Sequence, residues 1–88
     1  MTQETKREER LLTVYSRAWC HLCDDMLAAL QPLQEEFGYG LNVIDVDERP
    51  EFEARFGERV PVLVVDGREL CQYRLDAPAV RAYLLNLR

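Results

Sequence analysis

Two cysteines separated by two residues, Cys20 and Cys23, lie where a short apolar run passes into an amphipathic segment. At the start of a helix, two thiols at this spacing can pass between dithiol and disulfide with little backbone movement. Cys20 would lie among unpaired backbone N–H groups at the positive end of the helix dipole, which favours its thiolate form. Because the thiolate is the attacking species in disulfide exchange, the spacing predicts that Cys20 attacks a substrate disulfide and that Cys23 resolves the mixed disulfide.

Three neighbours of the pair have side chains that could assist this chemistry. Arg17, three residues before Cys20, carries a cation that would stabilise the thiolate. His21 would lower the pKa of the Cys20 thiol as an imidazolium, or accept the Cys23 proton as a neutral ring. Trp19 would offer an aromatic surface to a protein or peptide partner. Each also has an interpretation in which it plays no part in the chemistry. Arg17 would then be a solvated loop charge, His21 a surface histidine and Trp19 a ring that fills the core.

The same cysteines are compatible with two other kinds of function. In one, the chain is a binding or regulatory module without thiol turnover, and the pKa of Cys20 stays near the free value of about 8.5. In the other, Cys20, Cys23, the distant Cys71 and His21 bind a metal ion or an iron–sulfur cluster. Zinc requires four ligands in a tetrahedron, and this set is incomplete within one chain. We therefore expect no metal site.

Size and charge restrict the class of protein. The 88 residues suffice for one small domain, and 48% hydrophobic with 31% charged residues is typical of a globular protein. A net charge of −5 argues against nucleic acid or an anionic membrane as partner. No apolar run could span a bilayer, and the charged first ten residues are not a signal peptide, so we expect a cytoplasmic location. We also expect a monomer, which is the default for a small acidic domain. Three cysteines are too few for a disulfide-stapled secreted scaffold.

Strand and helix patterns alternate along residues 11–88, which we take as the domain, after a flexible tail over residues 1–10. The expected order is β-α-β-α-β-β-α, an α/β fold whose mixed central sheet has helices on both faces. We expect a hairpin turn at Asp66-Gly67 and a helix cap at Asp76. The first helix should end at Gly38, and Pro32 inside it should cause a kink or a local tightening. The expected strands are 11–15, 41–47, 60–65 and 68–74, and the expected helices begin at residues 20, 50 and 77.

The segments Val14–Asp25, Asp45–Asp47, Arg59–Leu63 and Asp66–Cys71 resemble the glutaredoxin-like branch of the thioredoxin fold, in particular a family of small bacterial-type proteins. The resemblance extends over residues 11–87. It implies thiol–disulfide oxidoreductase activity on a protein or small-molecule disulfide. It also implies that Pro61 is the cis-proline that faces the active-site cysteines, and that the backbone of Val60 pairs with an extended thiol substrate.

One segment departs from this resemblance. Glutathione-binding glutaredoxins carry a Gly-Gly pair followed by an acidic residue at the place where this chain reads Cys71-Gln72-Tyr73-Arg74. Without the glycines the backbone can approach a ligand less closely, and Arg74 has the wrong sign for an ammonium group, although Asp76 could substitute. We expect no tightly bound cofactor, and these departures disfavour glutathione as co-substrate. Cys71 is then either a third thiol near the site or a half-buried strand residue of no chemical consequence.

Overall fold

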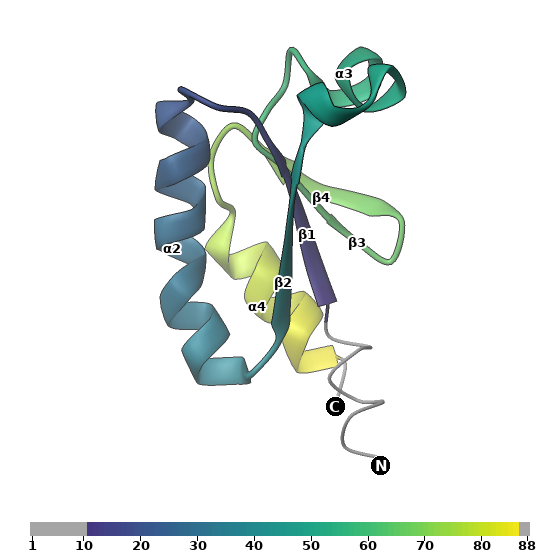
Figure 1. Ribbon diagram of the computed structural model, residues 1–88. Coiled ribbons are helices and arrows are strands. Elements are labelled where there is room, and N and C mark those ends of the chain that lie inside the picture. Colours follow the sequence, from purple (N-terminus) through teal and green to yellow (C-terminus); the bar gives the residue numbers. More distant parts are fainter. Residues whose placement is uncertain (1–10, 87–88) are drawn as a thin grey trace.

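A computed structural model describes residues 11–86 (Figure 1). The predicted tail, residues 1–10, and the last two residues of the predicted domain lie outside the described residues. The elements follow the predicted order: β1 (Leu11–Ser16), α2 (His21–Phe37), β2 (Gly40–Asp45), the 3-10 helix η1 (Val46–Glu48), α3 (Pro50–Phe56), β3 (Val62–Val65), β4 (Arg68–Gln72) and α4 (Ala77–Asn86).

The four strands form one mixed sheet in the order β2-β1-β3-β4. Strand β1 is parallel to β2 and antiparallel to β3, and β4 is antiparallel to β3. Tyr15, near the end of β1, therefore lies opposite Val62, the first residue of β3. As a result, the loop that follows β1 and the loop that precedes β3 lie at the same end of the sheet. Helices α2 and α3 both begin near this end, at the top of Figure 1.

Helices cover both faces of the sheet, as the sequence pattern predicts. On one face, α2 and α4 pack over a core that includes Leu12, Val14 and Leu63, all fully buried. On the other face, η1 and α3 contribute Val46 and Phe56 to a smaller core. This second core lies toward the end of the sheet where β1 stops, because the ring of Tyr15 stacks on Phe56 with ring centroids 4.1 Å apart. The remaining members of this smaller core are the buried Val62 and the partly buried Phe52, Val60 and Val64.

Several element boundaries differ from the sequence prediction by one or two residues, among them the start of β3 at Val62 rather than Val60, and three of these differences have a local cause. Cys20 is the N-cap of α2 rather than its first residue. The second strand ends at Asp45 because the Asp45 carboxylate accepts a hydrogen bond from the Asp47 N–H at 2.9 Å, which starts η1. The fourth strand ends at Gln72, after which Tyr73 adopts a φ of 69°. Helix α2 runs through Pro32 without interruption.

The predicted helix ends are confirmed. Gly38 ends α2 in the left-handed conformation, with a φ of 69°, and its N–H donates to the Gln34 carbonyl oxygen at 2.8 Å. Asp76 caps α4, because its carboxylate accepts from the Ala79 N–H at 3.2 Å. Across residues 11–86, every helix is too short or too polar to cross a membrane.

A buried tyrosine makes the stability of this fold sensitive to alkaline pH. The Tyr39 side chain is 4% exposed, and its hydroxyl donates to the Leu30 carbonyl oxygen at 3.0 Å. Burial raises the pKa of Tyr39 from 10.0 to about 12. The folded state therefore holds this proton more tightly than the unfolded state, so the stability that Tyr39 contributes is complete below pH 10 and is lost as the pH rises toward 12.

We expect Tyr39→Phe to lower the unfolding free energy by about 1 kcal/mol at neutral pH, because a buried hydrogen bond is removed. The same substitution should flatten the decline in stability above about pH 10. Urea unfolding of both proteins at a series of pH values measures the two effects together. Parallel stability curves would show that another group causes the alkaline loss.

Candidate active site at the Cys20–Cys23 disulfide

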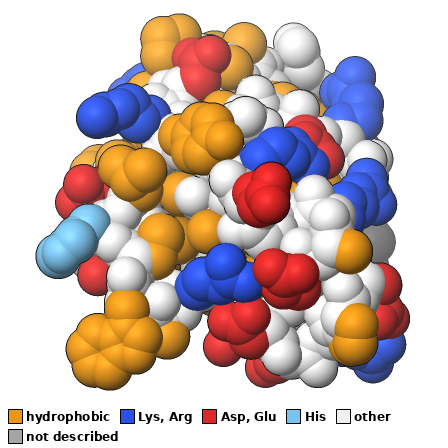
Figure 2. Space-filling view, turned by 90° about the horizontal axis from the view of Figure 1, so that it is seen from above, with side chains coloured by type: hydrophobic (Ala, Val, Ile, Leu, Met, Phe, Trp, Pro, Cys, Tyr) orange, Lys and Arg blue, Asp and Glu red, His pale blue; other side chains and the backbone are white. Residues whose placement is uncertain are grey.

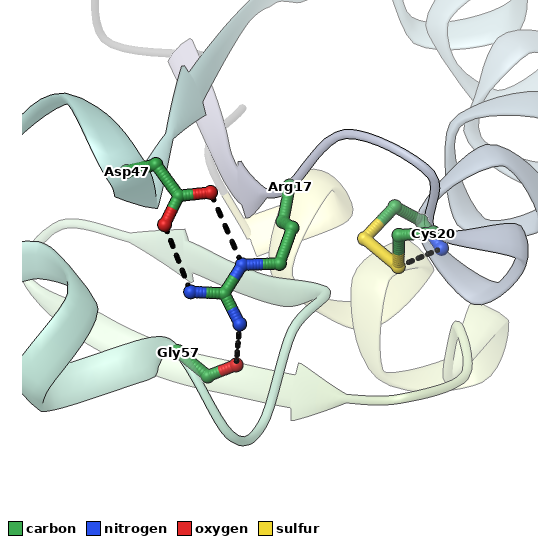
Figure 3. Close-up of a disulfide and its surroundings, with 5 residues drawn as sticks. Arg17, Cys20, Asp47 and Gly57 are labelled. Carbon is green, nitrogen blue, oxygen red and sulfur yellow. Dashed lines mark hydrogen bonds and ion pairs between the residues drawn. A yellow bond between two sulfur atoms is a disulfide. The ribbon is translucent and has the colours of Figure 1, made fainter.

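Cys20 and Cys23 form a disulfide at the start of α2, with their Cα atoms 5.2 Å apart. The Cys23 N–H donates to the Cys20 sulfur at 3.1 Å, so the sulfur is the side-chain acceptor that caps the helix (Figure 3). Cys20 is partly exposed, whereas Cys23 is 2% exposed. A thiolate on Cys20 would thus meet a backbone donor and the positive end of the helix dipole. The asymmetry in exposure lets an external sulfur reach Cys20 and shields Cys23.

Trp19 and His21 flank Cys20 and both point into solvent. The Trp19 side chain is 101% exposed, which excludes the core-filling reading, and its backbone adopts a φ of 59°. A bulky residue in the left-handed region is uncommon and carries a conformational cost of order 1 kcal/mol or more. His21 is the first residue of α2 and is exposed. Both residues therefore lie beside the disulfide, where a partner could contact them.

Val60 and Pro61 precede β3 at the same end of the sheet, and the peptide bond between them is cis. The carbonyl oxygen of Pro61 accepts a hydrogen bond from the Tyr73 N–H at 2.9 Å. This hydrogen bond holds the segment after β4 beside the loop before β3. Tyr73 itself is 43% exposed and has a positive φ. The sequence analysis missed Tyr73 as a site residue. The sequence did contain a signal for this segment. Glutathione-binding glutaredoxins have a Gly-Gly pair here, and glycine is the residue that adopts a positive φ without strain.

A shallow groove of about 290 Å³ runs beside the first turns of α2. Leu22 and Asp25, on either side of the buried Cys23, belong to one wall, and the segment after β4 forms the other. The full lining consists of Leu22, Asp25, Met26, Ala29, Tyr73, Arg74 and Leu75. The lining therefore combines apolar side chains with one acidic and one basic side chain, Asp25 and Arg74.

Arg17 does not lie against the cysteines. Figure 3 shows its guanidinium directed toward Asp47 and Gly57, away from Cys20. Nε donates to Asp47 Oδ2 at 3.2 Å and Nη2 donates to Asp47 Oδ1 at 2.9 Å. Nη2 also donates to Glu53 Oε2, and Nη1 to the Gly57 carbonyl oxygen, both at 3.2 Å. Hydrogen bonds with Asp47 and then Glu53 raise the pKa of Arg17.

Gly57 permits this arrangement by its lack of a side chain. A Cβ at residue 57 would lie 2.5 Å from the Glu53 carbonyl oxygen and 2.6 Å from Glu53 Oε2, the atom that accepts from Arg17. The sequence analysis did not identify Asp47, Glu53 or Gly57. Only Asp47 gave a usable signal, because it follows a strand parallel to β1 and so emerges at the same end of the sheet as Arg17.

Cys71 is a free, half-buried cysteine on β4, opposite Leu63. It packs against the core beneath α2 and α4, and burial raises the pKa of its thiol. This placement matches the half-buried strand reading of Cys71. Over the described range, 11–86, no group of three or more His, Cys, Asp or Glu side chains is arranged to hold a metal ion.

The end of the molecule that carries the disulfide has two different halves. Figure 2 shows the larger hydrophobic side chains mainly over its left part, on the side of α2, together with His and a few charged side chains, and most of the Lys, Arg, Asp and Glu side chains over its centre and right part, on the side of α3. Trp19 and Tyr73 are exposed hydrophobic residues of this end. Arg17 with Asp47 and Glu53 are among its charged pairs.

The element order, the strand order β2-β1-β3-β4 and the Cys-x-x-Cys pair at the start of α2 define a protein of the thioredoxin fold. The profile of the family described as Glutaredoxin-like domain (DUF836) matches residues 11–85, so the chain belongs to this family. Both expectations from the sequence, the fold class and the glutaredoxin-like resemblance, are confirmed.

Three relatives show how far the similarity extends. The solution structure of protein Ne2328 from Nitrosomonas europaea has a TM-score of 0.76 at 42% identity, over 84% of this chain and 89% of that chain. An uncharacterized protein of Mycobacterium tuberculosis is 36% identical over 72 residues, which is 76% of this chain and 74% of the relative. A protein of Listeria monocytogenes named Thioredoxin is 38% identical over 66 residues, 72% of this chain and 63% of the relative.

Proposed function

We propose that this protein is a thiol–disulfide oxidoreductase that works through Cys20 and Cys23. One observation carries the proposal: Cys20 is a partly exposed residue whose sulfur accepts a backbone N–H at the start of α2 and is bonded to the buried Cys23. Membership of the glutaredoxin-like family and the similarity to a relative named Thioredoxin support it. A pair of cysteines in a purely packing role would not require this combination of exposure and hydrogen bonding.

The reaction begins with the reduced pair. The Cys20 thiolate attacks one sulfur of a substrate disulfide, forms a mixed disulfide and releases the first substrate thiolate. The Cys23 thiolate then attacks the Cys20 sulfur, which closes the Cys20–Cys23 disulfide and releases the second substrate thiolate. Two electrons pass from the protein to the substrate, and the two protons of the dithiol are available to the two released thiolates. A dithiol or two monothiols of the cell must reverse these steps to regenerate the protein.

The residues around the disulfide suit contact with a protein or peptide. Trp19 offers a fully exposed ring next to Cys20, and the groove beside the first turns of α2 is lined in part by apolar side chains. In this proposal Trp19, His21, Val60 and Pro61 contact the segment that carries the substrate disulfide. Glutathione is disfavoured as co-substrate, because the segment Cys71-Gln72-Tyr73-Arg74 lacks the Gly-Gly pair of glutathione-binding glutaredoxins, and because Arg17 is engaged with carboxylates.

A redox titration tests the proposal. We expect the protein in glutathione redox buffers to show one two-electron transition, with a potential between about −270 and −120 mV. The count of free thiols should rise from one, Cys71, to three upon reduction, because the disulfide joins Cys20 and Cys23. Intact mass and thiol counting measure the transition, and Cys71→Ser serves as the control that lowers each count by one. If no intramolecular disulfide forms, or if Cys20 and Cys23 only take up glutathione singly, the dithiol mechanism fails and a binding module becomes the better description.

A further inference from the structure

The charged groups that contact Arg17, a residue of the loop before Cys20, do not balance. Arg17 lies three residues before Cys20, so their Cα atoms are at most about 11 Å apart. Its guanidinium meets two carboxylates, Asp47 and Glu53, in bonds of 2.9 to 3.2 Å. The cluster of Arg17, Asp47 and Glu53 therefore carries one positive and two negative charges. The guanidinium is turned away from Cys20, but the Cα atoms of the two residues lie well within the Debye length of about 30 Å at 0.01 M salt, so at low salt a substrate at Cys20 is exposed to this charge.

Arg17 is also occupied geometrically. Nε and Nη2 bind Asp47 in a two-pronged arrangement, and Nη1 binds the Gly57 carbonyl oxygen at 3.2 Å. A carboxylate of an incoming substrate would have to displace a bidentate, charge-assisted pair to reach this guanidinium. The side chain of Arg17 is 32% exposed, whereas those of Asp47 and Glu53 are 52% and 50% exposed. The surface that a substrate meets here is thus more carboxylate than guanidinium.

We infer that Asp47 and Glu53 determine the charge specificity of the active site by neutralising Arg17 and leaving a net negative cluster at the end of the sheet that carries Cys20. The consequence is selection against disulfides that carry net negative charge, glutathione disulfide among them, and in favour of disulfides with neutral or basic surroundings. This inference rests on the proposed function and deepens it. Asp24 and Asp25, both exposed in the first turns of α2, act in the same direction. Arg74, on the wall of the groove, acts in the opposite direction.

The test compares three small disulfides that react by the same exchange: glutathione disulfide with net negative charge, hydroxyethyl disulfide with none, and cystamine with net positive charge. The reduced protein attacks each through Cys20, and Cys23 completes the exchange, so two electrons reach the probe in every case. The variant Asp47→Asn with Glu53→Gln removes both negative charges and keeps oxygen atoms that can accept from Arg17. Second-order rate constants, followed by thiol loss and intact mass, give the ratio of glutathione disulfide to cystamine reactivity.

A matched control uses carboxylates of the same two elements that do not bond to Arg17. Glu48 belongs to η1 and Glu51 to α3, and Glu51 pairs with Arg49 instead. The variant Glu48→Gln with Glu51→Gln changes the net charge by the same amount. We expect the ratio of glutathione disulfide to cystamine reactivity to rise about fivefold at low salt in the variant that lacks the Asp47 and Glu53 charges, because Coulomb interactions are only weakly screened there. The rise should be clearly smaller in the control. In 1 M salt the gain should largely disappear.

A third comparison assigns the effect to Arg17. Arg17→Gln in the otherwise unchanged protein should lower the ratio, and the same substitution added to the Asp47 and Glu53 variant should take back part of the gain. The inference is overturned if the ratio stays within about twofold of the starting protein, or if the control raises it equally. Failure of the proposed function is a separate result, in which the unchanged protein reacts with none of the three disulfides. The rate with hydroxyethyl disulfide and the thermal unfolding midpoint identify a variant that has misfolded.

Discussion

Cys20→Ser abolishes disulfide exchange, and Cys23→Ser stops it at the mixed disulfide: these are the results that we expect for the two single substitutions. The difference follows from exposure. Cys20 is partly exposed and meets the substrate, whereas Cys23 is 2% exposed and is bonded only to Cys20. Serine oxygen is not a nucleophile toward disulfides at neutral pH, so Cys20→Ser should lose more than about 99% of the exchange rate.

The second substitution tests the order of the steps. In Cys23→Ser the Cys20 thiolate still attacks the substrate, but no neighbouring thiol releases the product, so a protein–substrate adduct should accumulate in stoichiometric amount. Intact mass spectrometry under non-reducing conditions detects the adduct and gives its mass. The experiment is done in a Cys71→Ser background, because Cys71 is the free cysteine of the described residues and could otherwise act as an unintended resolving thiol.

Two results would contradict the assignment of roles. If adducts accumulate on Cys20→Ser instead, then Cys23 is the attacking sulfur and the observed exposure does not represent the reduced protein. If both variants exchange disulfides at the starting rate, the chemistry does not use this pair at all. In that case the exposed Trp19 and the neighbouring groove would favour a binding function.

The parts of this site that the sequence predicts correctly depend on neighbours within one helical turn. The helix start at Cys20 and the pairing of Cys20 with Cys23 follow from the Cys-x-x-Cys spacing and from the apolar spacing from Leu22 onward, which predicts the helix. The caps at Gly38 and Asp76 are likewise local, because each involves backbone groups at most four residues away. Such local features depend on no contact with a distant part of the chain.

The environment of Arg17 shows what the sequence cannot supply. Its three partners lie 30, 36 and 40 residues further along the chain. The pairing of β1 with β2 brings Asp47 to the same end of the sheet as Arg17. Whether the carboxylates reach the guanidinium also depends on side-chain positions and on the position of α3 over the sheet, which leave no local pattern. The sequence therefore predicts a cation near Cys20 and gives no indication that two carboxylates neutralise it. The backbone of Tyr73 is similar, because its positive φ follows from its bond to Pro61 across the sheet end.

Neighbouring leucines of α4 provide a sharp test of the core that supports the site. Leu84 is 1% exposed and belongs to the core shared by α2 and α4, together with Met26 and Leu30 of the helix that starts at the active site. Leu85, the next residue, is 48% exposed. We expect Leu84→Ala to lower the unfolding free energy by about 2 to 5 kcal/mol, through lost burial and the cavity left behind. Leu85→Ala should change it by no more than about 0.5 kcal/mol.

The pair is informative because the two substitutions have the same chemistry, the same helix and the same intrinsic helix propensity. A domain of this size has a total stability of roughly 4 to 13 kcal/mol, so Leu84→Ala would remove a large part of it. Urea unfolding of the oxidised proteins, with the Cys20–Cys23 disulfide intact, measures both changes at one redox state. Equal losses for Leu84→Ala and Leu85→Ala would mean that α4 does not pack on α2 as described, and that the positioning of Cys20 depends on the sheet alone.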